Sequence, residues 1–372
     1  MTNHLLRRAL IMLTLPAVLA ILLAGCGGQQ NAQDQSATNG KTGKEPAGTS
    51  AAGANTAEKK YTPPEKMLPP PEPADSPPLK EKPAGKVIDV GSLPEGLVAD
   101  PKTGLVAVGL RNPDQLALVD SKTGKLVRKV KLSGSARHLG LLASGGPVLV
   151  PAETSDSLVQ VSLPEGKIVS ETPVDNYPHN VASAPNGRIF VISEARSTAS
   201  MVENRKVVEK IKVPANPGGG AVTKSGLLGA VGVRGLALGV YKADTLDSLG
   251  FLDAGKGPTH VAAGPDDRFY VTDTRGGVVL VYQTRPELKQ VARISLPGGS
   301  PYGIAVDTQR KHLWVTLTAK NRLIEYDLRD GSPRQVASYP TVRQPNSVTV
   351  NPATGRVFVA GRTEGVLQMI DP

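Results

Sequence analysis

Cysteine and aromatic residues are the scarcest components of this 372-residue chain. Cys26 is the only cysteine, so the chain can form neither an intramolecular disulfide nor a zinc site built from several cysteines. Aromatic residues make up 3% of the composition, and no run rich in lysine and arginine is interleaved with them. The chain therefore lacks the stacking platforms and basic tracks of a nucleic-acid-binding surface, and we expect no nucleic-acid partner.

Several motifs that carry chemistry are also absent. The sequence contains no Walker phosphate loop, no GxSxG elbow, no HExxH and no calcium loop of the EF-hand type. The glycine run at residues 218–220 is not followed by a helical pattern. We therefore interpret that run as a junction between repeat units and not as a phosphate cradle.

The first 25 residues have the pattern of a secretion signal, which is removed from a mature protein. Arg7 and Arg8 precede an apolar run, and Leu-Ala-Gly stands directly before Cys26. Leu-Ala-Gly-Cys resembles the bacterial lipobox, in which the cysteine is lipidated and becomes the mature N-terminus. This resemblance implies an extracytoplasmic lipoprotein anchored to a bacterial cell membrane by lipid on Cys26, without a spanning helix. An uncleaved anchor and an ordinary signal peptide are the alternatives.

Residues 26–85 are predicted to form a disordered tether that begins with the lipidated cysteine. Their first half is polar, and their second half has nine prolines between Pro63 and Pro83, with no hydrophobic periodicity in either half. Such a segment is expected to bury nothing and to carry no chemistry. The tether has seven lysines and seven acids, so the formal charge of +10 leaves +8 on residues 86–372 once the two signal arginines are removed. That charge favours an anionic partner, such as an acidic polymer, lipid headgroups or a small anion.

A unit of about 40–45 residues recurs along residues 86–372. Its clearest copy, at residues 300–328, alternates short apolar runs with polar turns. The apolar runs begin 40 to 44 residues apart, at Leu97, Leu139, Val181, Ala221, Val261, Ile304 and Val348. This spacing predicts an all-β fold, a seven-bladed β-propeller with four strands in each blade.

The two ends of the repeat region complement each other. Residues 86–90, KVIDV, have the pattern of a lone strand that precedes the first full unit. The last unit, from Asn346, has only three strands before the chain ends at Pro372. We therefore expect the N-terminal strand to complete the last blade and close the ring.

The repeats themselves resemble known families. The segments PYGIAVD at residues 301–307, RLIEYDL at 322–328 and GPTHVAAGPDDRFYVTD at 257–273 resemble YVTN and YncE-like β-propeller repeats. They are also similar to repeats of streptogramin lyase and of the NHL and gluconolactonase propellers. The resemblance covers residues 86–372 and implies the propeller fold. It leaves function open, because these families include binding proteins, lyases and lactonases.

The residue before each inner strand of a propeller faces the central channel. The repeat alignment places there Glu95, His138, His179, Gly219, Thr259, Tyr302 and Asn346, and His260 follows Thr259. The histidines, with Glu95 and Tyr302, are candidate catalytic residues. Glu95, His138 and His179 also form a candidate site for a divalent metal, and we expect no other cofactor. In the alternative interpretation, these side chains only hydrogen-bond channel water and loop backbone.

A second set of similar positions is basic. The turn after the second strand carries Arg111, Arg196, Arg234, Arg275, Lys320 and Arg362 in six of the units. With Asn346, these cations form a candidate binding mouth for carboxylate or phosphate groups. Alternatively, they pair with nearby acids such as Glu194 and Asp273.

Taken together, the patterns predict a lipoprotein whose propeller binds a ligand or partner on its loop face, with an anion as the expected class. Nothing in the sequence demands turnover, so we expect a binding protein. The alternative is a channel-site lyase or lactonase that uses Glu95, His138 and His179.

Overall fold

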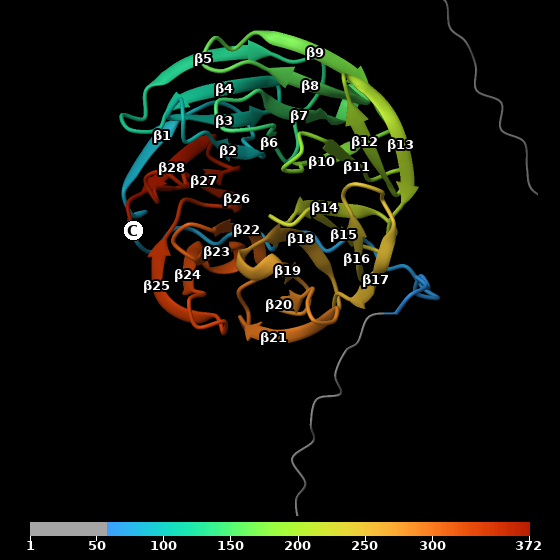
Figure 1. The fold of residues 1–372 in the computed structure, drawn as a ribbon. Coiled ribbons are helices and arrows are strands. Elements are labelled where there is room, and N and C mark those ends of the chain that lie inside the picture. Colours follow the sequence, from blue (N-terminus) through green and yellow to red (C-terminus); the bar gives the residue numbers. More distant parts are fainter. Residues whose placement is uncertain (1–57) are drawn as a thin grey trace, which may run out of the picture. The chain divides into compact units, whose positions relative to one another are not determined.

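The computed structural model describes residues 58–372. The predicted signal at residues 1–25, Cys26 and the first part of the tether lie outside the described residues. Seven four-stranded antiparallel sheets form a ring around a central channel (Figure 1), which confirms the predicted propeller. Within residues 58–372, no helix is both long enough and apolar enough to cross a membrane.

The strands are named here from the innermost to the outermost in each blade. Blades 1 to 3 contain β2 (Leu97–Ala99), β3 (Leu105–Leu110), β4 (Gln115–Asp120), β5 (Leu126–Lys131); β6 (Gly140–Leu141), β7 (Val148–Ala152), β8 (Ser157–Val161), β9 (Ile168–Pro173); and β10 (Pro178–Ser183), β11 (Ile189–Ser193), β12 (Thr198–Glu203), β13 (Lys206–Lys212). Blades 4 and 5 contain β14 (Pro217–Val222), β15 (Leu227–Gly232), β16 (Ala237–Lys242), β17 (Ser248–Asp253); and β18 (Pro258–Ala263), β19 (Phe269–Asp273), β20 (Val278–Gln283), β21 (Lys289–Ser295). Blades 6 and 7 contain β22 (Pro301–Asp307), β23 (His312–Leu317), β24 (Arg322–Asp327), β25 (Arg334–Pro340); and β26 (Pro345–Val350), β27 (Val357–Gly361), β28 (Val366–Ile370), β1 (Lys86–Asp89). Three short 3-10 turns occur in the loops, η1 (Glu153–Ser155), η2 (Pro265–Asp267) and η3 (Thr318–Lys320).

The burial of each strand follows from its place in the blade. The second strands β3, β7, β11 and β19 are buried at every position, because neighbouring blades cover both faces of the sheet. Their sequences are accordingly continuous apolar runs. Outer strands face solvent on one side, and β13, KVVEKIK, is exposed or half-buried along its whole length.

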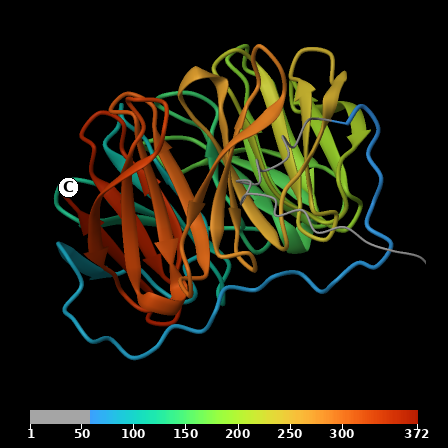
Figure 2. The same cartoon turned by 90° about the horizontal axis from the view of Figure 1, so that it is seen from below.

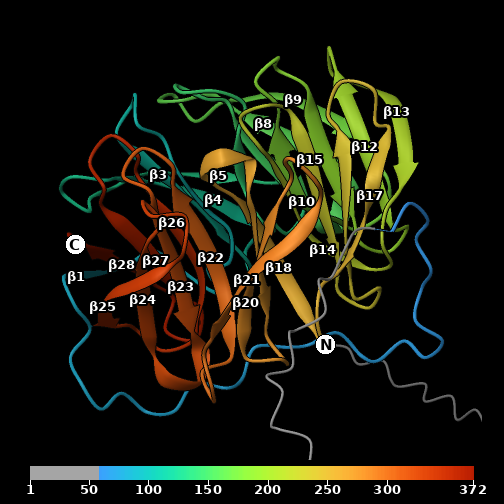
Figure 3. The same ribbon diagram turned by 60° about the horizontal axis from the view of Figure 1, so that its bottom comes forward.

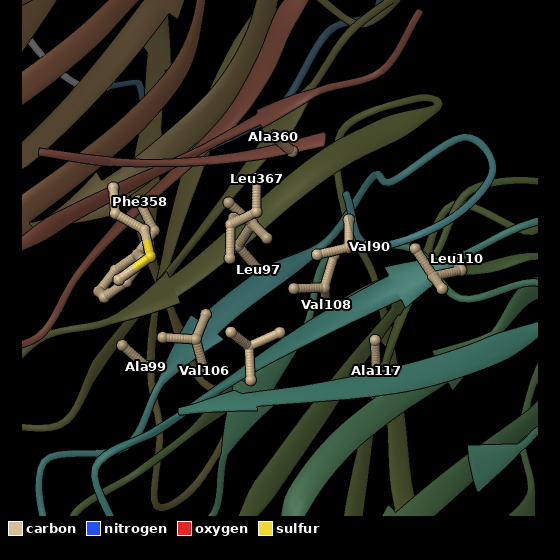
Figure 4. Close-up of a cluster of buried hydrophobic side chains, with 12 residues drawn as sticks. Val90, Leu97, Ala99, Val106, Val108, Leu110, Ala117, Phe358, Ala360 and Leu367 are labelled. Atoms are coloured by element: carbon tan, nitrogen blue, oxygen red, sulfur yellow. The ribbon is translucent and has the colours of Figure 1, made fainter. Parts of the chain in front are cut away.

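The ring closes between the N-terminal strand and the last strand of the chain. β1 pairs antiparallel with β28, from Lys86 opposite Met369 to Asp89 opposite Val366. Behind this seam, Val90 is 1% exposed and lies in a cluster of apolar side chains from blades 1 and 7 (Figure 4). The predicted completion of the last blade by residues 86–90 is confirmed.

Five inner strands begin with a proline and then carry a β-bulge. In β10, Pro178 pairs with Ser193 and Asn180 pairs with Ile192, so His179 has no partner opposite it. The same shift leaves Gly218, Thr259 and Asn346 unpaired in blades 4, 5 and 7, and Tyr302 with Gly303 in blade 6. A bulge re-aims the extra residue away from the sheet. The bulges therefore create the ring of side chains around the channel mouth.

Residues 58–85, which we call the strap, follow one face of the ring without regular structure. Figures 2 and 3 show the strap in blue, running from the side of β17 to that of β1. At one end, Glu58 exchanges two backbone hydrogen bonds with Phe251 of β17. Ser76, near the middle, is 6% exposed. The expectation that the whole proline-rich tether buries nothing is therefore wrong for this part of it.

Candidate functional site

A cavity of about 410 Å³ lies at the channel mouth. An upper ring of residues surrounds it, each within three residues of the start of an inner strand, and comprises Glu95, Arg137, His179, Gly218, Thr259, Tyr302 and Asn346. The predicted ring is correct at five of these positions and displaced by one residue at two, where it named His138 and Gly219. At blade 4 a glycine is required, because a Cβ on Gly218 would lie 2.6 Å from the Thr259 carbonyl oxygen.

The two displaced residues belong to a lower ring, one residue deeper in the channel. This ring lines a smaller cavity of about 130 Å³ and includes His138, Asn180, Gly219, His260, Gly303 and Ser347. His138 Nε2 and His260 Nε2 are 3.0 Å apart. Blades 2 and 5 are thus joined across the channel by two imidazoles below the mouth cavity.

The protonation of this histidine pair follows from its partners. His260 Nδ1 lies 3.1 Å from the Tyr302 carbonyl oxygen. A carbonyl only accepts, so Nδ1 carries a proton, Nε2 of neutral His260 accepts, and His138 Nε2 donates. Burial and the neighbouring His179 lower the pKa of His260 to about 4. Burial and the neighbouring His260 and His179 lower the pKa of His138 well below its ordinary value. The imidazoles of His138 and His260 are therefore both neutral at pH 7.

An alternating network of arginines and carboxylates forms one side of the mouth. The Glu95 carboxylate lies 2.9 Å from Arg137, 3.2 Å from Arg362 and 3.8 Å from Arg111. Burial alone would raise the pKa of Glu95, but these three guanidinium groups together hold it below its ordinary value. Because Arg362 comes from blade 7 and Arg137 from blade 2, the network links blade 1 to both of its neighbours.

Glu153 continues the network into blades 2 and 3. Its carboxylate lies 2.6 Å from Arg111 and 2.8 Å from Arg137. His179 Nδ1 lies 3.9 Å from Glu153 and 2.8 Å from Glu194 Oε2. Burial would raise the pKa of Glu194, but the contacts with His179 and Asn216 lower it. Glu194 and His179 thus form a carboxylate–imidazole pair on a single blade.

The residues that best fit a divalent metal differ from the predicted set. In residues 58–372, Glu153, His179 and Glu194 form the group of three whose ligand atoms all lie within 4.8 Å of one another. His179 Nδ1 is buried and lies 2.8 Å from Glu194 Oε2, so a metal at this site would be held through this nitrogen and the two carboxylates. The predicted set of Glu95, His138 and His179 shares only His179 with this group, because three arginines surround Glu95 and His138 pairs with His260.

The six predicted cations contact different partners and do not form one ring around the mouth. Only Arg111 and Arg362 line the mouth cavity, and both contact Glu95. Arg234 donates to the Leu68 carbonyl and Arg275 to the Pro69 carbonyl, at 3.0 and 2.9 Å. The other two donate to nearby oxygens, Arg196 to Asn176 and Lys320 to the Pro297 carbonyl. Pairing of Arg196 with Glu194 and of Arg275 with Asp273 is therefore not what the structure shows.

Acidification should destabilise the propeller through the histidine pair. Below pH 6.5 the unfolded chain protonates these histidines while the folded chain keeps them neutral, so the free energy of unfolding falls as the pH falls. For His260 alone, the free energy of unfolding falls by about 3 kcal/mol as the pH approaches 4. The carboxylates whose pKa is lowered in the folded chain reduce the free energy of unfolding further only below about pH 4.5. Urea denaturation between pH 7 and 4.5 measures this slope, and a His138→Gln/His260→Gln variant should flatten it. An unchanged slope in that variant would contradict neutral histidines.

Four residues of the mouth cavity or of the ion-pair network were not among the predicted site residues. The repeat alignment already gives Arg137 as the strict equivalent in blade 2, one position before the predicted His138, and the structure places Arg137 at the cavity. Glu153 interrupts the basic positions in blade 2, and that exception marks the acid that Arg111 and Arg137 share. The role of Glu194 beside His179, and that of Gln344 at the mouth, depend on contacts that no spacing in the sequence reveals.

No protein-family profile and no curated protein sequence matches the chain. Solved structures match its fold. Hydrazine synthase of Kuenenia stuttgartiensis aligns with a TM-score of 0.66 and 18% identity, over 77% of this chain and 97% of that one. A streptogramin B lyase aligns with a TM-score of 0.65 and 14% identity, over 76% of this chain and 96% of that one. Virginiamycin B lyase of Staphylococcus aureus aligns with a TM-score of 0.63 and 16% identity, over 77% and 99%.

These similarities establish the fold alone. The chain is a seven-bladed β-propeller, and streptogramin-lyase-type propellers are among its structural neighbours. At such low identity, a shared fold says little about activity. Membership in the YVTN or YncE-like family remains a prediction from the repeat sequences.

Proposed function

We propose that this chain is a membrane-anchored extracytoplasmic lipoprotein whose propeller binds a small polar ligand in the mouth cavity. The observation that carries the proposal is the convergence of polar side chains from six of the seven blades on one cavity beneath the strap. Its volume of about 410 Å³ lies in the range of small-molecule sites. The anchor rests on the lipobox resemblance at Cys26.

The lining refines the expected ligand class. Arg111, Arg137 and Arg362 line the cavity, yet each already contacts a carboxylate. Glu72 and Asp75 of the strap add two acids to the lining of the cavity. A compensated wall of this kind suits a ligand that has both donors and acceptors, such as a zwitterion or a polar peptide end, better than a polyanion.

Binding of defined compounds tests this proposal. A panel of amino acids, hydroxy acids and short peptides should yield binders by saturation-transfer NMR, and Arg362→Met should weaken them. Loss of a hydrogen bond to a charged group corresponds to about tenfold or more in affinity. The matched control is Arg188→Met, which removes a rim arginine that pairs with Glu203. Equal binding by both variants and the unaltered protein, or no binder at all, would contradict the proposal.

A lyase or lactonase is the second candidate, because His179 and Glu194 lie 2.8 Å apart at the cavity. A histidine beside a carboxylate suits general acid–base chemistry. A divalent metal held by Glu153, His179 and Glu194 would supply Lewis-acid polarisation of a bound carbonyl.

One neighbouring structure names a substrate class to try on this chain. A catalytically inactive virginiamycin B lyase has been solved with quinupristin. Incubation of quinupristin with this protein, with and without magnesium or zinc, tests the enzyme candidate by chromatography. The enzyme candidate would be supported if the protein consumes quinupristin, the His179→Ala variant does not, and the His312→Ala variant still does. Intact quinupristin in every sample would exclude this substrate and favour a binding protein.

A further inference from the structure

The strap spans the mouth between two well-defined attachment points. On one side, Arg275 donates to the Pro69 carbonyl at 2.9 Å, next to the Arg234 contacts with the carbonyls of Met67 and Leu68. On the other side, Ser76 is buried against blades 6 and 7. Proline residues lack an N–H and leave only carbonyls to satisfy, so arginine donors suit a proline-rich segment.

The stretch between these points, residues 70–75, is held much less firmly. Its Pro70, Pro71, Glu72, Pro73 and Asp75 line the mouth cavity. In the described part of the chain, the hydrogen bonds of this stretch to the propeller involve Ala74 alone, which contacts Ser300 and Gln344. Pro71 packs over Gly257, where a Cβ would lie 3.1 Å away. We call residues 70–75 the lid.

One side chain connects the lid to the cavity wall. Gln344 Oε1 accepts from the Ser76 backbone N–H at 2.9 Å, and the Gln344 backbone N–H donates to Ser76 Oγ at 2.9 Å. The side-chain amide of Gln344 also donates through Nε2, to the Ala74 carbonyl and to Asn346 Oδ1, each at 3.2 Å. Asn346 lines the cavity. A ligand that bonds Asn346 Oδ1 therefore competes with Gln344 Nε2, the nitrogen that also donates to the lid at Ala74.

We propose that residues 70–75 are a built-in lid on the mouth cavity, and that the Ser76–Gln344–Asn346 contacts form a latch that ties lid opening to occupation of the cavity. The inference rests on the proposed binding function for its purpose, but lid closure itself requires no ligand. A ligand enters when the latch releases, while the Arg234 and Arg275 contacts keep the strap on the ring. The strap thereby regulates access to the site that it covers.

Thiol labelling in the absence of ligand tests the lid. Val233 lines the cavity and is 9% exposed. In the full chain in detergent, with Cys26→Ser, the change Val233→Cys introduces a single thiol whose reaction with iodoacetamide reports cavity access. Ser76→Ala with Gln344→Ala should accelerate that reaction by about tenfold or more, since several hydrogen bonds are lost. Pro71→Gly with Pro73→Gly, which changes the strap alone, should accelerate it as well.

The matched control is Arg322→Ala. It removes the contact between Arg322 and Glu81, which holds the strap outside the lid, and the labelling rate should stay unchanged. Equal rates in the latch variant, the proline variant and the control would overturn the lid. Fast labelling in the unaltered background would overturn it too. Because no ligand takes part, failure here leaves ligand binding intact as a proposal, whereas failure to find a binder leaves the lid in place.

Discussion

Replacement of Glu95 by alanine should lower the free energy of unfolding by about 3–5 kcal/mol, the usual cost of removing one partner from a buried ion pair. Glu95 is 5% exposed and is shared by Arg111, Arg137 and Arg362. Without its carboxylate, three guanidinium groups remain close together with Glu153 as their main counter-charge. Their repulsion acts between blades 7, 1 and 2. Urea denaturation at pH 7 measures the loss.

Glu203→Gln is the control for this variant. Glu203 pairs with Arg188 at a half-exposed rim position, where an ion pair contributes about 0–1 kcal/mol. A Glu95→Ala variant that loses no more than this control would show that the arginines find other partners. The network would then not join blade 1 to blades 7 and 2.

Removal of residues 86–90 should be at least as damaging. The deletion takes away β1, its ladder with β28 and the side chain of Val90. Burial of a valine is worth about 1.5–3 kcal/mol, and each lost backbone hydrogen bond adds about 1 kcal/mol, so we expect about 5 kcal/mol or more. The exposed edge of β28 should also promote aggregation.

The control deletion removes residues 30–57, which the sequence predicts to bury nothing. Differential scanning calorimetry, with light scattering to follow aggregation, compares the two proteins. The deletion of residues 86–90 should unfold at a clearly lower temperature, and the control should match the unaltered protein. Equal midpoints would mean that β1 does not close the ring.

Local pattern was enough to predict the fold. Each of the seven blades repeats the same order of apolar runs and turns, so the pattern is clear although each copy is weak by itself. The extra strand at residues 86–90 matches the strand that the last blade lacks. The channel site was predicted less well, because its register depends on bulges. The bulge of blade 4 puts Gly218 at the mouth and leaves Gly219 one residue deeper. In blade 2 the mouth position belongs to Arg137, and His138 lies in the lower ring.

The strap was missed for a different reason. Its composition gives it little apolar surface to bury, and composition was the basis for predicting a free tether. It is held instead by polar donors on distant loops, as in the contact of Arg275 with Pro69, 206 residues away. A single sequence contains no signal for such a contact, because arginine in a turn is compatible with many partners.

Histidine-selective NMR tests the central claim, that the covered channel mouth is the ligand site. Four of the five histidines lie in residues 58–372. His138, His179 and His260 lie at the two rings, and His312 lies outside them, 2.6 Å from Glu325. Titration with the compounds that bind should shift the ring resonances, that of His179 most, and leave those of His312 unchanged. Binding that shifts His312 alone, or none of the three channel histidines, would contradict the account.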